Sequence, residues 1–147
     1  MKKLTAFVQE HIGDDLTRLI LDRKKWPDID IDLAVSCIQS RRKLKGKVQE
    51  ANRTIKLANA EFKAAASSMD YMADSAEGIQ KKLEQLNKVY KAQNTILDSY
   101  KKELELIVKE QGENSAAADN MRIKIANQQA AVNKTAAELA TYEKKLD

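Results

Sequence analysis

The chain has 147 residues, with one Pro, four Gly and 5% aromatic residues, a composition typical of an elongated all-α protein rather than of a thick globular core. Lys and Arg number 26 against 22 Asp and Glu, and the whole excess lies in residues 1–47, which argues against a nucleic-acid-binding surface along the full chain. No run of about 18 apolar residues occurs, so no membrane span is expected, and the single cysteine, Cys37, cannot form an internal disulfide.

Residues 1–47 are predicted to form a small helical module. Two short helices are expected on either side of Gly13, and Pro27 must end the second, because proline disfavours helical geometry in the residue before it. A third short helix is expected to follow, capped by Asp28, Asp30 or Asp32, with its apolar face made by Leu33, Ala34, Cys37 and Ile38. A module of this size is near the lower limit for independent stability, so it is expected to need a neighbour.

Residues 48–147 carry apolar residues at alternating steps of three and four, the heptad pattern of helices that pack side by side. Long amphipathic helices are expected at about 48–72, 76–110 and 115–146. The coiled-coil seam of the last two comprises Leu83, Leu86, Tyr90, Leu97, Tyr100, Leu104, Ile107, Met121, Ile125, Val132, Leu139 and Tyr142, with Gln93, Gln128 and Thr135 as polar members. Val89 and Ile96 lie beside this seam, so another helix, from residues 48–72 or from a second copy, should cover them.

The segment around Gly112 predicts a bend between the last two helices. Gly112 can adopt the left-handed conformation that ends a helix, and Asn114 or Ser115 can cap the next one. An antiparallel hairpin is therefore favoured. One unbroken rod is the alternative, because the heptad phase of Ile107 and Met121 agrees across the gap. At the start of the hairpin, Asp74 is predicted to cap the helix that begins at about residue 76.

Few residues are candidates for chemistry. The motif at Asp28–Asp32 has the opening spacing of a calcium loop, but Leu33 and Gln39 occupy the positions that need Gly and Glu, so helix capping is the better explanation. His11 and Cys37 are each single, which argues against a zinc site. Neither a Gly-rich phosphate loop nor a nucleophile elbow is present. We therefore predict no catalytic, cofactor-binding or metal-binding residues and no enzymatic activity.

A run of cations, Arg41, Arg42, Lys43, Lys45 and Lys47, is the one charged motif. One interpretation is contact with the phosphates of a nucleic acid or a membrane surface. The other is a solvated helix end whose cations complement the negative end of the helix dipole before Gly46. The second is favoured, because no aromatic residues are interleaved with the cations to stack on bases.

Four segments carry a resemblance to a known family: IKLANAEFKAA at Ile55–Ala65, GIQKKLEQLN at Gly78–Asn87, KEQGENS at Lys109–Ser115 and KIANQQAAVNKT at Lys124–Thr135. With the rest of residues 44–147, they resemble the N-terminal coiled-coil region of phage tail tape measure proteins. The resemblance implies a structural protein, here a truncated or fused fragment, that sets tail length during virion assembly. It also implies self-association through the coiled coil, tail tube or tail assembly proteins as partners, and a location in the bacterial cytoplasm during assembly and then in the phage tail. The family's long central and membrane-active parts are missing.

The first third of the chain resembles a different family. The segments KKWPDIDIDLAV at Lys24–Val35 and IQSRRK at Ile38–Lys43 are similar to the helical N-terminal segment of a bacterial class I S-adenosylmethionine-dependent methyltransferase with a THUMP-like domain. That family's cofactor loop and catalytic residues have no counterpart here, so no activity follows. The alternative function implied is a nucleic-acid-binding helical module, joined to the coiled-coil region near Leu44–Val48.

Overall fold

The computed structural model describes residues 31–68 and 71–146, except the side chains of 31–34, and in this part of the chain it is all-α. The described residues form α3 (Ile31–Ala66), α4 (Ala76–Gln111) and α5 (Ala116–Leu146), without a strand. The prediction of an all-α protein is confirmed. The two short helices expected before Pro27, with His11 and the motif's Asp28 and Asp30, lie outside the described residues.

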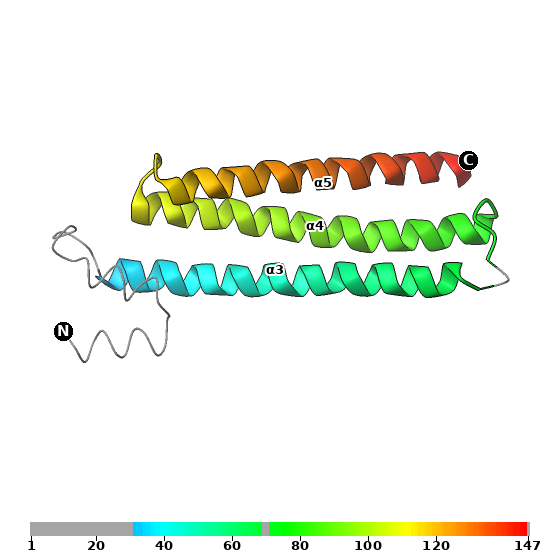
Figure 1. Ribbon diagram of the computed structural model, residues 1–147, viewed down its shortest axis with the longest axis horizontal. Coiled ribbons are helices and arrows are strands. Elements are labelled where there is room, and N and C mark those ends of the chain that lie inside the picture. The colour runs from blue at the N-terminus through cyan, green and yellow to red at the C-terminus, as the bar shows by residue number, and fades with distance from the viewer. Residues whose placement is uncertain (1–30, 69–70, 147) are drawn as a thin grey trace.

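The three helices form an open layer with α4 in the middle. They lie side by side and alternate in direction, with α3 and α5 on different sides of α4 (Figure 1). Within the described residues, no Cα atom of α3 comes within 8 Å of one of α5. Among these three helices only α4 therefore has two neighbours, and α3 and α5 each keep an outer face that neither of the other two covers.

The first helix is longer at its start than the sequence predicts. A helix was expected at 48–72, but α3 runs without a break from Ile31 to Ala66 and so includes the third short helix expected near Asp32. Gly46 lies inside α3 rather than at a boundary. A single glycine in a helix costs only about 1 kcal/mol relative to alanine. The packing of Leu44 and Ala51, 7% and 6% exposed, on either side of it is enough to carry the helix through.

Serine residues end α3 before Met72. The hydroxyl of Ser67 donates to the carbonyl oxygen of Ala64 at 2.8 Å, and the backbone N–H of Ser68 donates to the carbonyl oxygen of Ala65 at 3.2 Å. The bond from the Ser67 hydroxyl competes with the helical pattern, and the tighter backbone bond at Ser68 turns the chain out of the helix.

The cap of α4 is Ser75, not Asp74. Ser75 has an extended backbone (φ −74°, ψ 157°), and its hydroxyl oxygen accepts a hydrogen bond from the N–H of Gly78 at 3.0 Å. The same hydroxyl donates to the carbonyl oxygen of Met72 at 2.7 Å, so one side chain holds both the turn and the helix start. A Cβ on Gly78 would overlap the Met72 carbonyl oxygen, which explains why a glycine stands in this first turn.

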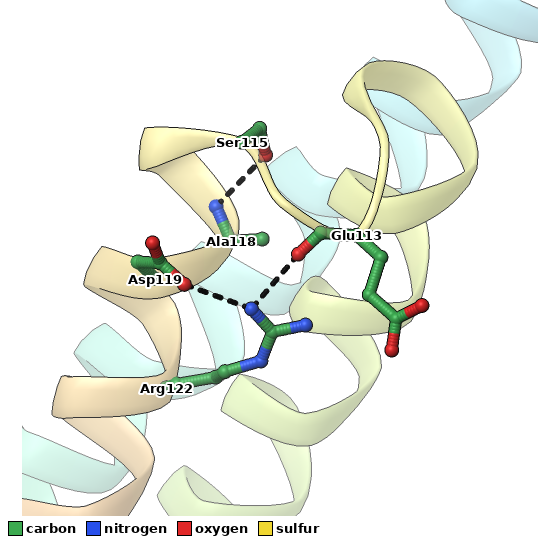
Figure 2. A network of polar contacts seen from close by, with 5 residues as sticks. All are labelled: Glu113, Ser115, Ala118, Asp119 and Arg122. Carbon is green, nitrogen blue, oxygen red and sulfur yellow. Dashed lines mark hydrogen bonds and ion pairs between the residues drawn. The ribbon is translucent and has the colours of Figure 1, made fainter.

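The turn between α4 and α5 depends on a glycine and a serine. Gly112 has φ 96° and ψ 158°, a conformation open almost only to glycine, and its N–H donates to the carbonyl oxygen of Val108 at 2.9 Å. Of the two possible caps for the next helix, Ser115 is the one used, since it accepts from the N–H of Ala118 at 3.1 Å (Figure 2).

A bridging arginine ties this turn to the first turns of α5. Arg122 Nη1 donates to the backbone oxygen of Glu113 and to Asp119 Oδ1, both at 2.9 Å (Figure 2). One guanidinium thereby fixes the turn to the helix that follows it.

Among the described residues, two small apolar clusters lie at the contacts of α4 with its neighbours. Between α3 and α4, Ala51 packs with Ala92 and Ile96, so the helix expected to cover Ile96 is α3 of the same chain. Between α4 and α5, Ile107 packs with Ala118 and is 2% exposed. Because small residues line both contacts, the helices can approach closely with little apolar volume between them.

Candidate functional site

Five residues of the predicted seam, Tyr100, Leu104, Ile107, Met121 and Ile125, pack in one apolar cluster between α4 and α5. Six of the seam residues are buried: Leu86, Leu97, Ile107, Met121, Val132 and Leu139. The other six are half-buried: Leu83, Tyr90, Tyr100, Leu104, Ile125 and Tyr142. The seam thus contributes to the apolar packing of α4 on α5, and one of its residues, Tyr100, also packs against the cluster between α3 and α4.

Two of the three polar members of the seam, Gln93 and Gln128, meet across the contact between α4 and α5. Gln128 Nε2 donates to the backbone oxygen of Gln93 at 3.0 Å, while the side-chain oxygen Oε1 of Gln93 is buried without a hydrogen-bond partner. The buried hydroxyl of Thr135 donates within its own helix, to the carbonyl oxygen of Ala131 at 3.2 Å. A single interhelical hydrogen bond at a seam position favours one register over others.

Exposed polar contacts join α3 to α4 between the last turns of α3 and the first half of α4. Gln85 Nε2 donates to Asn59 Oδ1 at 2.8 Å, and Lys88 Nζ lies 3.5 Å from Glu61 Oε2. Both side chains of the ion pair are more than half exposed, so it contributes only about 0–1 kcal/mol.

The five cations of the basic run do not gather on one surface. Arg41 is turned towards α4, where its Nη1 lies 3.7 Å from Glu110 Oε2, and the two side chains are only 15% and 4% exposed. Arg42, Lys43 and Lys45 are exposed, and Lys47 borders a groove described below. Successive helical residues point about 100° apart, so a run along one helix is spread around it.

The position of this run also corrects the helix-end interpretation. Gly46 lies inside α3, and the helix continues for five more turns to Ala66. The C-terminus of α3 lies at Ala66, well beyond the cations, so the run does not complement the dipole of its own helix. Arg41 instead lies beside Glu110, in the last turn of α4.

An acidic residue that the site prediction missed lies opposite the run. Glu103 of α4 is 2% exposed, and its Oε1 has no hydrogen-bond partner. Burial raises the pKa of Glu103, while the charges of Arg41 and Lys45 from α3 and of Lys124 from α5 lower it and only partly offset the burial. A signal existed in the sequence, because steps of seven from Val89 and Ile96 lead directly to Glu103.

The thiol of Cys37 on α3 is also buried, and charges at the end of α4 act on it. Burial raises its pKa, and the carboxylate of Glu110 raises it further, while Lys109 and Arg41 lower it. A thiol with a raised pKa is present mostly in its protonated, weakly nucleophilic form. Cys37 therefore acts as a small apolar residue, 3% exposed, in the packing of α3.

A groove of about 510 Å³ runs between α3 and α4 on the side of Lys47. Its floor is formed by Ala51 and Ala92. Its walls carry three lysines, one glutamate and two threonines: Lys47, Lys88, Lys91, Glu50, Thr54 and Thr95. These side chains can attract anions but offer no nucleophile paired with a base.

No group of three or more His, Cys, Asp or Glu side chains in 31–68 and 71–146 is arranged to hold a metal ion. None of α3, α4 and α5 is long and apolar enough to cross a membrane.

Comparison with known proteins adds no relative. Neither a protein-family model, nor a curated protein, nor a solved structure matches the chain.

Proposed function

We propose that the chain is a structural, non-enzymatic protein of the phage tail tape measure type that assembles with further copies of itself. Tail tube or tail assembly proteins are its proposed partners, in the bacterial cytoplasm during assembly and then in the tail. The resemblance of residues 44–147 supports this family. A second heptad stripe on α5, exposed to solvent, supports the self-association.

This exposed stripe lies on the face of α5 that points away from α4. Ile123 is 58% exposed, and the other members, Ala126, Ala130, Asn133, Ala137 and Ala140, are exposed as well. Their spacing alternates three and four, as in the seam that faces α4. A helix with two heptad stripes is suited to two helical neighbours, and α5 has only one within the described residues.

A second copy of α5 fits this stripe in antiparallel orientation. With the twofold axis between Ala130 and Asn133, Ile123 of one copy lies level with Ala140 of the other, so a large side chain meets a small one. In the same register Asp119 lies level with Lys144, and both are exposed. The charges are complementary at both ends, as expected for a symmetric interface between identical surfaces.

The substitution Ile123→Glu is expected to abolish self-association while leaving the fold intact. It places a charge at each end of the proposed interface, and Ile123 is exposed, so the stability of the single chain should change by less than about 0.5 kcal/mol. Sedimentation velocity should show a dimer or larger species for the unchanged protein and a monomer for the variant, with equal helicity by circular dichroism.

Leu57→Glu is the matched control. Leu57 is 55% exposed but lies on α3, away from the stripe, so this variant should associate like the unchanged protein. A strictly monomeric unchanged protein at high concentration would contradict the proposal. The tail assignment is tested separately by the neighbouring genes: tail tube and baseplate genes support it, and a methyltransferase core downstream contradicts it.

The alternative function, nucleic-acid binding through the basic run, is expected to be weak. The run is spread around α3, so few cations can contact one phosphate backbone, and the salt dependence of binding should be shallow. The test is oligonucleotide binding at low and moderate salt by Lys43→Glu and Lys47→Glu. Arg41 is left unchanged because it pairs with Glu110. Tight binding that falls steeply with salt and is lost in these variants would favour the alternative.

A further inference from the structure

The carboxylate of Glu103 on α4 is buried with an incomplete set of partners, and charges from both α3 and α5 act on it. It is 2% exposed, its Oε1 has no hydrogen-bond partner, and no cation lies within ion-pair distance of it in the described part of the chain. A buried ionised carboxylate without a partner is strongly unfavourable, and such a group relieves the cost by binding a proton.

The charged groups facing Glu103 are already engaged or lie too far away. From α3, Arg41 and Lys45 act on the carboxylate, but Arg41 is ion-paired with Glu110, 3.7 Å away. From α5, Lys124 acts on it, with its Nζ 6.0 Å from the centre of the Tyr100 ring. One arginine therefore serves two carboxylates that are seven residues apart on the same face of α4.

The buried Nε of Arg41 likewise lacks a hydrogen-bond partner. The Arg41 guanidinium thus leaves one of its own N–H donors without an acceptor, and it gives the Glu103 carboxylate no hydrogen bond to Oε1. The packing of α3 on α4 at this level is compatible with a neutral Glu103 and strained by a charged one.

We infer that Glu103 is a proton-binding site that couples the packing of α3 and α5 on α4 to pH. When Glu103 is protonated, the layer buries a neutral group. When Glu103 ionises, the layer must either keep a buried charge with incomplete partners or loosen to admit water. This property belongs to the single chain and holds with or without association through α5.

The direction of the pH effect follows from the pKa of Glu103. Burial raises this pKa in the folded chain above the ordinary value that the unfolded chain retains, so the folded chain binds more protons between the two values. Stability contributed by Glu103 is therefore fully present below the ordinary glutamate range, near pH 4.3, and is lost as pH rises through the raised value. The thiol of Cys37, with its own pKa raised, stays neutral in this window.

Urea unfolding of the full chain between pH 4 and pH 8, followed by circular dichroism, tests the inference with Glu103→Gln. The amide keeps the shape of the protonated acid and cannot ionise. The measured quantity is the unfolding equilibrium constant of the unchanged protein divided by that of the variant. This ratio should rise with pH, by at most about tenfold per pH unit, because a single proton is involved. The variant should have the higher urea midpoint near neutral pH. A difference between the two proteins that is constant across pH would overturn the inference.

Glu110→Gln is the matched control, since it makes the same chemical change one heptad further along the same face. It removes the ion-pair partner of Arg41 and is expected to lower the urea midpoint near neutral pH. If both variants raised the midpoint alike, the effect would not be specific to Glu103 and the inference would fail.

A direct titration keeps the test independent of how the variants fold. The side-chain carboxyl carbon of Glu103, followed by nuclear magnetic resonance in the unchanged protein, should titrate above the exposed glutamates of the same chain. Titration together with those exposed groups would overturn the inference.

Discussion

Replacing Ile107 with alanine is expected to destabilise the protein by about 2–5 kcal/mol. Ile107 is the largest side chain that is fully buried in the described part of the chain, and it packs with Ala118 and Met121 at the contact between α4 and α5. Removing its three outer carbons loses their burial and leaves a cavity, because a neighbour as small as Ala118 cannot expand to fill it. Urea unfolding followed by circular dichroism measures the change.

The matched control for this prediction is Leu57→Ala on α3. Leucine and isoleucine lose the same number of carbons, but Leu57 is 55% exposed, so its truncation should change stability by less than about 0.5 kcal/mol. Equal losses in the two variants would mean that the contact between α4 and α5 does not contribute as described.

Replacing Gly112 with alanine is expected to destabilise the protein by about 1–3 kcal/mol. The backbone at Gly112 has φ 96° and ψ 158°, where a Cβ is strained, yet an added Cβ would meet no atom within 4 Å. The whole effect therefore comes from the backbone of the turn and not from a clash. Thermal and urea unfolding measure it.

Gly46→Ala is the counterpart with the opposite expected sign. Gly46 lies inside α3, and a Cβ there would also meet nothing within 4 Å. Alanine should stabilise the helix by about 0.4–1 kcal/mol. Destabilisation by Gly46→Ala would show that α3 is interrupted at this glycine, against the structure described above.

The surroundings of the basic run could not be predicted from the run itself. The five cations are evident in the sequence, but their surroundings are not, because Arg41 meets Glu110 only when α3 and α4 pack antiparallel. The same packing turns Lys47 towards the groove with Glu50. Neighbours from another helix are a non-local property, and a short run carries no information about them.

Glu103 is a different case, because its place was visible in the heptad pattern. It occupies the same heptad position as Val89 and Ile96, beside the seam, where another helix was expected. A carboxylate at a position that is otherwise apolar conflicts with the local pattern, and such conflicts often mark a functional or strained residue. Its burial and its lack of a partner, however, depend on α3 and α5 together.

The sequence by itself determined the helical class and, to within about one residue, the places where α4 and α5 begin and end. These features depend on local chemistry: the spacing of apolar residues, a glycine at φ 96° and serines that accept from free N–H groups. Only the tertiary structure decided that α3 passes through Gly46 without a break, that α4 lies between α3 and α5, and that those two helices do not meet. The physical reason is that helix packing is set by contacts between distant residues, which outweigh a propensity difference of about 1 kcal/mol at one glycine.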